Sequence, residues 1–309
     1  MSIFQLLAHN PALFIATCLV LGLLVGSFLN VVIYRVPVML NRDWRAQCAE
    51  LAAEDEGRVP AVAAAAEAKP AERFNLVVPR SACPKCKRPI GALENIPVIS
   101  WLFLRGRCAG CGTAISWRYP FVEVLTGVMS AAVAWKFGFG WPVLGGLVLT
   151  WFLISLTFID VDTQLLPDNM TLPLVWLGLF ASLLGPAAHG EPTPVDLRSA
   201  AIGAIGGYMS LWLVFHAFRL VTGKEGMGYG DFKLFAALGA WLGWKMLLPI
   251  ILVAALVGAV SGIVILWAQK QERSTPIAFG PFLAASGWLM LMFGNELVDR
   301  YMGLFAPHP

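Results

Sequence analysis

Apolar runs long enough to cross a lipid bilayer recur along the chain, and they limit the possible folds more than any other feature. Residues 11–33 form the first run, and about 20 residues are needed to span the hydrocarbon core. Inside that core every backbone N–H and C=O must find a partner within the protein, so runs of this length fold as helices. The share of hydrophobic residues, 58%, also exceeds the roughly 45–50% of soluble domains. The sequence therefore predicts an all-α polytopic membrane protein.

The orientation of these runs follows from the Lys and Arg residues beside them, because segments that face the cytoplasm carry an excess of both. With both termini outside, eighteen of the 22 Lys and Arg residues fall in cytoplasmic segments and four fall outside. A cleaved signal peptide is the alternative for the first run, but residues 1–10 contain no Lys or Arg and the run is longer than a signal core. We expect about eight transmembrane helices, over residues 11–33, 121–135, 141–159, 169–184, 200–220, 232–241, 247–267 and 279–293.

A long polar segment separates the first run from the others. Residues 35–119 hold thirteen of the 22 Lys and Arg residues, which predicts a cytoplasmic location. Within this segment, residues 46–72 are rich in alanine and mixed charge, and indicate a helical or flexible insertion without a chemical signature. We therefore expect three parts: a first span at residues 1–34, a cytoplasmic domain at residues 35–119 and a transmembrane domain at residues 120–309.

Two cysteine pairs in the cytoplasmic segment have the spacing of a zinc site. They read Cys83-Pro-Lys-Cys86 and Cys108-Ala-Gly-Cys111, with 21 residues between them. Each pair lets two thiolates reach one tetrahedral ion, and the two pairs together complete a closed structural site. Disulfides or a redox pair are the alternatives, but both fit poorly with a cytoplasmic loop. Cys83, Cys86, Cys108 and Cys111 are thus the predicted metal ligands, forming a small zinc-binding module between the first and second spans.

Basic residues around the cysteine pairs raise the possibility of nucleic-acid binding. These residues are Lys85, Lys87, Arg88, Arg105 and Arg107. The same charges follow from the excess of Lys and Arg in any cytoplasmic segment of a membrane protein. We therefore expect no nucleic-acid partner.

Two aspartates border apolar runs at places that the span count brings to the same side of the membrane. Asp160 directly follows the run at residues 141–159, and Asp231 directly precedes the run at residues 232–241. Three glycines, at 226, 228 and 230, remove side chains just before Asp231, so another backbone can approach closely. Two carboxylates brought together could share a proton and activate a water, as in aspartic proteases.

A loop and a helix cap are the simpler explanation for a glycine-rich turn followed by an aspartate. The membrane context favours function, because ionisable residues that border hydrocarbon are costly. In the first acidic cluster, Asp162 falls on another helix face and Asp168, after Pro167, suits an N-cap. Asp160 and Asp231 are therefore the predicted catalytic pair.

Several motifs in one order resemble the type IV prepilin peptidases, a family of Gly-x-Gly-Asp membrane aspartic proteases. The resemblance extends over nearly the whole chain. The segments that carry it, besides the cysteine pairs, are Val25-Gly-Ser-Phe-Leu-Asn-Val31, Asn95-Ile-Pro-Val-Ile-Ser-Trp101, Arg118-Tyr-Pro-Phe-Val-Glu123, Phe158-Ile-Asp-Val-Asp-Thr-Gln-Leu-Leu-Pro-Asp168, Gly226-Met-Gly-Tyr-Gly-Asp-Phe-Lys-Leu234 and Thr275-Pro-Ile-Ala-Phe-Gly-Pro281.

The resemblance implies an enzyme of the bacterial inner membrane with two activities. It would cut the basic leader from type IV prepilins and type II secretion pseudopilins at the cytoplasmic face. It would then methylate the new N-terminal amine with S-adenosylmethionine as methyl donor. By motif position Asp160 and Asp231 take the catalytic places and the four cysteines take the metal places. No glycine fingerprint of a Rossmann domain occurs in the cytoplasmic segment, so the residues that bind the methyl donor stay unassigned.

Two other classes of protein share some of these features. A proton-coupled transporter would also place acids at membrane edges, but it would be expected to show broken helices in repeated halves, and no internal repeat is evident. A zinc-bearing membrane scaffold would explain the cysteines and leave the two aspartates without a purpose.

Overall fold

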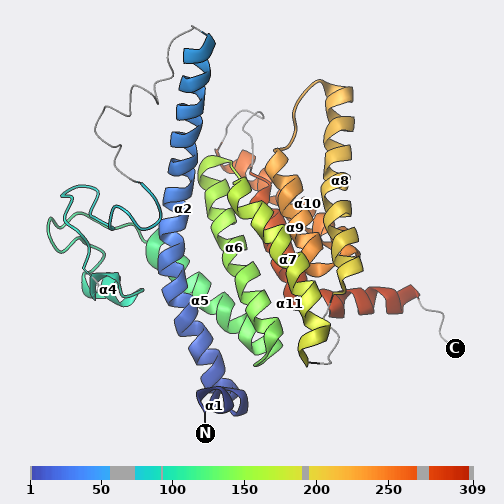
Figure 1. Ribbon diagram of the computed structural model, residues 1–309, viewed down its shortest axis with the longest axis horizontal. Helices are drawn as coiled ribbons and strands as arrows, with labels where there is room; N and C mark the ends of the chain where they lie inside the picture. The colour runs from blue at the N-terminus through green and yellow to red at the C-terminus, as the bar shows by residue number, and fades with distance from the viewer. Residues whose placement is uncertain (1, 56–73, 92, 190–194, 270–277, 306–309) are drawn as a thin grey trace. The chain divides into compact units, whose positions relative to one another are not determined.

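The computed structural model describes residues 2–55, 74–91, 93–189, 195–269 and 278–305. Throughout these ranges the regular structure is helical, with two isolated β-bridges and no strand (Figure 1). The predicted all-α class is confirmed. The helices are α1 (Ile3–His9), α2 (Pro11–Asp55), η1 (Leu93–Asn95), α4 (Ile99–Phe103), α5 (Arg118–Phe137), α6 (Trp141–Thr163), α7 (Asp168–His189), α8 (Leu197–Thr222), α9 (Tyr229–Leu242), η2 (Trp244–Met246), α10 (Leu247–Gln269) and α11 (Gly280–Phe305).

Five helices of the described part are long and apolar enough to cross a membrane, as expected of a membrane protein. A helix also covers each of the eight predicted apolar runs, except that α11 begins one residue after Phe279. Helix α9 has 14 residues and is about 21 Å long at 1.5 Å per residue, shorter than the roughly 30 Å hydrocarbon core. The count of eight spans stays a prediction. The five candidate spans are Pro11–Ala53, Arg118–Phe137, Trp141–Thr163, Leu197–Thr222 and Trp244–Val264.

Helix α2 does not end with its apolar run. It continues past residue 33, through Pro37, as far as Asp55. The first part of the alanine-rich insertion at residues 46–72 therefore extends this helix, and the part after Asp55 lies outside the described residues.

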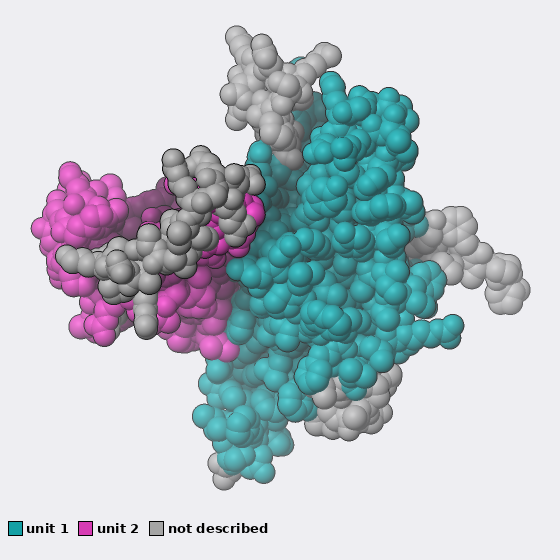
Figure 2. Space-filling model, turned by 45° about the horizontal axis from the view of Figure 1, so that its top comes forward, with its two compact units in different colours: residues 1–19, 128–309 teal, residues 20–127 magenta. Residues whose placement is uncertain are grey.

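The chain forms two compact units (Figure 2). Residues 1–19 and 128–309 make up the helix unit, which contains α6 to α11. Residues 20–127 make up the cysteine unit, which contains most of α2, both cysteine pairs and the start of α5. The predicted domain boundaries at residues 34 and 119 lie where apolar runs begin and end, so they differ from the boundaries of these compact units. The three predicted domains stay a prediction.

Helix α9 packs against α7, α8, α10 and α11 and is buried on nearly all sides (Figure 1). Gly203 of α8 and Gly239 of α9 let the two backbones meet, because a side chain on either would strike the backbone of the other. On the other side, Trp241 Nε1 donates to the carbonyl of Leu174 in α7 at 2.9 Å. These contacts fix the position of α9, and with it the position of Asp231 in its first turn.

In the cysteine unit, α2 meets α5 through glycine and polar contacts. A Cβ on Gly26 would lie 2.7 Å from the Cα of Glu123, so the two helix backbones touch there. Asn30 donates to the carbonyl of Tyr119 at 3.1 Å. The Glu123 carboxylate accepts from the backbone N–H of Val98 at 2.7 Å, which ties the segment before α4 to α5. These contacts join three of the motifs that are far apart in the sequence.

Candidate functional site

Asp160 lies one turn before the end of α6 and is only 5% exposed. The helix ends at Gln164, whose left-handed backbone lets its N–H bond the carbonyl of Asp160 at 2.8 Å. The carboxylate itself accepts from the backbone N–H of Gly280, at the start of α11. The Oδ2 atom of Asp160 is buried and has no hydrogen-bond partner among the described residues. Buried unpaired oxygens are rare and often belong to catalytic groups.

Asp231 is the third residue of α9 and is 7% exposed. Its side chain reaches back to the backbone N–H of Gly228, the N-cap residue, as the acid of a capping box does. Unpaired N–H groups make the start of a helix favourable for negative charge. The sequence therefore places this carboxylate in the first turn of a buried helix, where a backbone N–H holds its side chain.

The structure brings Asp160 and Asp231 together. Asp160 lies near enough to act electrostatically on Asp231. Leu166, in the turn between α6 and α7, lies beside both, because its Cβ faces Gly230 and its Cδ1 faces Gly280. Two buried carboxylates brought together in this way are the arrangement in which one can act as an acid and the other as a base.

The other two acids of the first cluster lie outside this pair. Asp162 is exposed on α6. Asp168, the first residue of α7, is also exposed and binds Lys233 of α9, with Nζ at 2.5 and 2.6 Å from its two oxygens. This ion pair connects the first residue of α7 to the fifth residue of α9. No local sequence pattern indicates this ion pair, because Asp168 and Lys233 meet only after both helices have packed.

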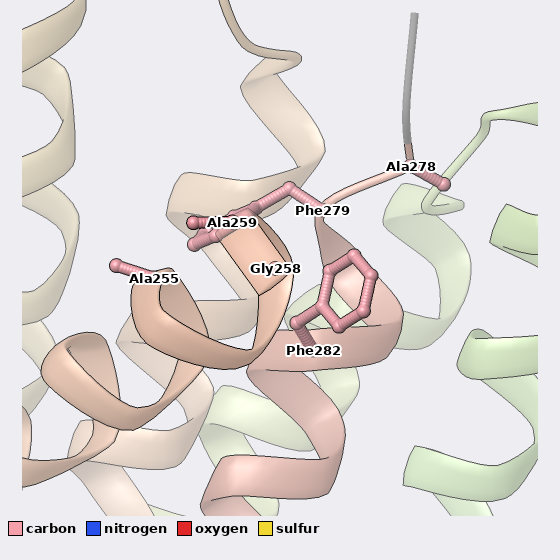
Figure 3. A pocket seen from close by; sticks show the side chains of 6 residues that line it. All are labelled: Ala255, Gly258, Ala259, Ala278, Phe279 and Phe282. Atoms are coloured by element: carbon pink, nitrogen blue, oxygen red, sulfur yellow. The ribbon is translucent and has the colours of Figure 1, made fainter. Parts of the chain in front are cut away.

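A shallow hollow lies between α10 and the start of α11 (Figure 3). It measures about 160 Å³ and contains no group that could exchange a proton. The residues that line it are Ala255, Gly258, Ala259, Ala278, Phe279 and Phe282. The hollow is thus apolar and is lined by Phe279, which directly precedes Gly280. Neither Asp160 nor Asp231 lines it.

The four predicted ligand cysteines gather in the cysteine unit. Their sulfur atoms all lie within 4.8 Å of one another, and all four are free thiols. The Sγ atoms of Cys83 and Cys111 are 3.7 Å apart. A tetrahedral zinc with Zn–S bonds of about 2.3 Å requires sulfur atoms about 3.8 Å apart. The cluster therefore fits a metal ion of this kind, and none of the four cysteines is in a disulfide.

The two pairs have matching backbone geometry. In the first, the N–H of Lys87 bonds the carbonyl of Cys83, and in the second the N–H of Gly112 bonds the carbonyl of Cys108, both at 2.9 Å. Lys87 and Gly112 both have a positive φ, at 58° and 68°. Each turn thus closes in the same way and aims its two thiols at one point.

The surroundings of Cys111 favour its thiolate. The hydroxyl of Thr113 lies 3.2 Å from the Cys111 sulfur. Bonds from this hydroxyl and from the backbone of Thr113 lower the pKa of the Cys111 thiol to about 6. A thiolate is the form that binds a metal, so this contact suits a ligand position.

Two family models match successive parts of the chain. The model described as the bacterial peptidase A24 N-terminal domain matches residues 20–137. The model described as the type IV leader peptidase family matches residues 147–263, which include both Asp160 and Asp231.

Similar proteins match over nearly their whole length. A prepilin leader peptidase/N-methyltransferase of Aeromonas salmonicida is 49% identical over 303 residues, which is 98% of this chain and 99% of the relative. Proteins with the same name from Stutzerimonas stutzeri and Pseudomonas aeruginosa are 51% and 48% identical, and the matches cover 96% and 98% of this chain and 97% and 98% of those relatives. No solved structure matches the chain.

Proposed function

The chain belongs to the type IV leader peptidase family, and we propose that it removes the leader peptide from prepilins and pseudopilins and then methylates the new N-terminus. The observation that carries the peptidase activity is the buried carboxylate pair, which lies in the part matched by the leader peptidase model. A proton-coupled transporter or a zinc-bearing scaffold accounts for neither the family nor the pairing of the acids.

Asp160 and Asp231 are the proposed catalytic residues. One carboxylate takes a proton from a water that attacks the scissile carbonyl, and the other gives a proton to the leaving amine. Burial supports this role, because a low-dielectric site strengthens the coupling that keeps one proton on the pair. The N–H groups of Gly280 and Gly228 hold the two side chains in place while the proton moves.

The four-cysteine cluster is proposed to hold a structural zinc ion. Cys83, Cys86, Cys108 and Cys111 would fill all four positions, so the ion would stabilise the fold of the cysteine unit and take no part in peptide cleavage. S-adenosylmethionine, when bound, supplies the methyl group. We assign cleavage to the transmembrane domain at residues 120–309, which follows a first span at residues 1–34 and a cytoplasmic domain at residues 35–119 that holds the four cysteines.

The proposed location is the bacterial inner membrane, with eight spans and the catalytic face toward the cytoplasm. The distribution of Lys and Arg supports this orientation. Asp160 near the end of one helix and Asp231 at the start of another would then both lie at the cytoplasmic edge.

The function is tested with purified protein, a prepilin that carries its leader, and mass spectrometry. We expect the prepilin to lose the mass of its leader without S-adenosylmethionine, and the product to gain one methyl group when the donor is added. A prepilin of unchanged mass after incubation with folded enzyme would contradict the peptidase proposal. Loss of the leader without any methyl gain would contradict only the second activity.

Gly230→Ala is expected to lower the rate of leader removal by about 100-fold, since a shift of about 1 Å in a reacting group can cost that much. A Cβ at this position would lie 2.6 Å from the Cβ of Leu166 and 3.2 Å from its carbonyl oxygen. Backbone atoms cannot rotate away, so the first turn of α9 must move and carry Asp231 with it. Initial rates of prepilin cleavage measure the effect.

Gly228→Ala is the matched control for this change. Its Cβ would lie 3.7 Å from Asp231 Oδ2, an ordinary contact, and the N–H that binds Asp231 is kept. We expect a loss of less than about 10-fold, in line with a modest change at an N-cap. Equal losses in the two variants would show that the contact of Gly230 with Leu166 does not matter.

A further inference from the structure

Gly280, the first residue of α11, touches the carboxylate of Asp160. Its backbone N–H donates to that carboxylate. A Cβ on Gly280 would lie 2.5 Å from Asp160 Oδ2 and 3.2 Å from Asp160 Cγ. The first distance is shorter than any that real Cβ atoms keep, so an ordinary side chain at residue 280 and the present position of the Asp160 carboxylate exclude each other.

The backbone of Gly280 does not itself require glycine. Gly280 is not among the residues with a positive φ. The first helical position also accepts most residues, because its N–H has no partner within the helix. Glycine at this position is therefore explained by the space that Asp160 needs and not by backbone conformation.

The carboxylate that Gly280 accommodates is the one with a buried, unpaired oxygen. Asp160 Oδ2 has no hydrogen-bond partner among the described residues, although Asp160 is only 5% exposed. The atom nearest to a Cβ at residue 280 is this same Oδ2. A larger residue would thus displace the oxygen that is left free to bind a proton or a water.

We propose that Gly280 is a positioning residue for Asp160 in leader removal. It acts in two ways: its N–H fixes the direction of the carboxylate, and its missing side chain keeps the place of Oδ2 open. This inference rests on the proposed peptidase function. It adds the start of α11 to the proposed site. The motifs around Asp160 and Asp231 do not by themselves indicate this part of the chain.

The test is Gly280→Ala in the full-length, membrane-embedded enzyme. The new methyl group would meet the ends of two flexible side chains, Asp160 and Leu166, the latter with Cδ1 at 3.1 Å. The side chains can turn aside, so the fold should persist while the carboxylate moves. We expect kcat for prepilin cleavage to fall by about 100-fold, as for other small misplacements of a reacting group, with KM changed by less than about two-fold.

Two comparisons separate positioning from general damage. Methylation of a pilin that already lacks its leader should stay at the wild-type rate, because it does not use Asp160. Gly206→Ala, on α8, is the matched control, since its Cβ would meet only Leu247 Cδ1 at 3.3 Å. We expect cleavage by this variant within about two-fold of wild type.

Wild-type cleavage by Gly280→Ala would overturn the inference and leave the proposed function intact, whereas a wild-type enzyme that never cleaves prepilin would remove the function itself. A rise in KM with unchanged kcat would also overturn it, because substrate binding would then be the affected step. If methylation is lost as well, the Leu166→Ala/Gly280→Ala double variant replaces the single one, with Leu166→Ala as its reference. The double variant removes the contact of the new methyl group with Leu166 and keeps its contact with Asp160. Cleavage by the double variant at the rate of Leu166→Ala would therefore overturn the inference.

Discussion

Asp160→Asn and Asp231→Asn are each expected to abolish leader removal, lowering the rate by about 10⁴-fold, the upper range for loss of a general acid or base. Asparagine keeps the shape of aspartate but cannot exchange the proton. Both variants should insert and purify normally. Their thermal stability should stay close to that of the wild type, because asparagine keeps the volume of the side chain and can still accept from the N–H groups of Gly280 and Gly228. Mass spectrometry of prepilin after long incubation measures the residual rate.

Asp162→Asn provides the control for these variants. It changes the same residue type on the same helix, two positions away and exposed. We expect its cleavage rate to stay within about three-fold of wild type, as usual for surface positions away from a reacting group. If Asp160→Asn or Asp231→Asn cleaved at nearly the wild-type rate, that residue would lose its catalytic role, and Asp162 and Asp168 would be the next acids to test.

Replacing any one of Cys83, Cys86, Cys108 or Cys111 with serine is expected to release the zinc ion and unfold the cysteine unit. The binding free energy of a structural zinc is folding free energy, of order 10–16 kcal/mol in small zinc modules. Methylation should fall more than cleavage if this unit builds the site of the methyl donor. Cleavage should fall less, because both aspartates lie in the helix unit. Elemental analysis should find one zinc per wild-type chain and none in the variants.

Cys48→Ser is the control for metal binding. Cys48 is exposed on α2 and does not belong to the cluster. Its replacement should change neither the zinc content nor either activity. Folded wild-type protein that is active in both reactions and contains no zinc would disprove the metal proposal.

The sequence alone was sufficient to predict the helices and the gathering of the four cysteines, because both depend largely on residues close together along the chain. A helix closes its hydrogen bonds within four residues, and an apolar run specifies where it can lie in a membrane. The run before Asp160 and the run after Asp231 thus predict α6 and α9 to within a few residues. Each Cys-x-x-Cys pair likewise forms its own turn, so the only long-range step was the meeting of two pairs.

The length of α2 shows one limit of this reasoning. Its apolar run ends at residue 33, yet the helix continues to Asp55 over a segment that contains charged residues from Arg35 onward. Hydropathy marks where a helix can be buried in lipid. It does not mark where the backbone hydrogen bonds of the helix end.

Contacts between distant segments were decided only by the tertiary structure. Asp160 and Gly280 are 120 positions apart, and no local pattern indicates that the N–H of one faces the carboxylate of the other. The same holds for Lys233 and Asp168. Helix periodicity determines which residues share a face, but the neighbour of that face depends on how closely backbones can approach, as Gly203 and Gly239 allow between α8 and α9. The sequence by itself therefore determined which acids belong to the proposed site, and packing decided which backbone groups hold them.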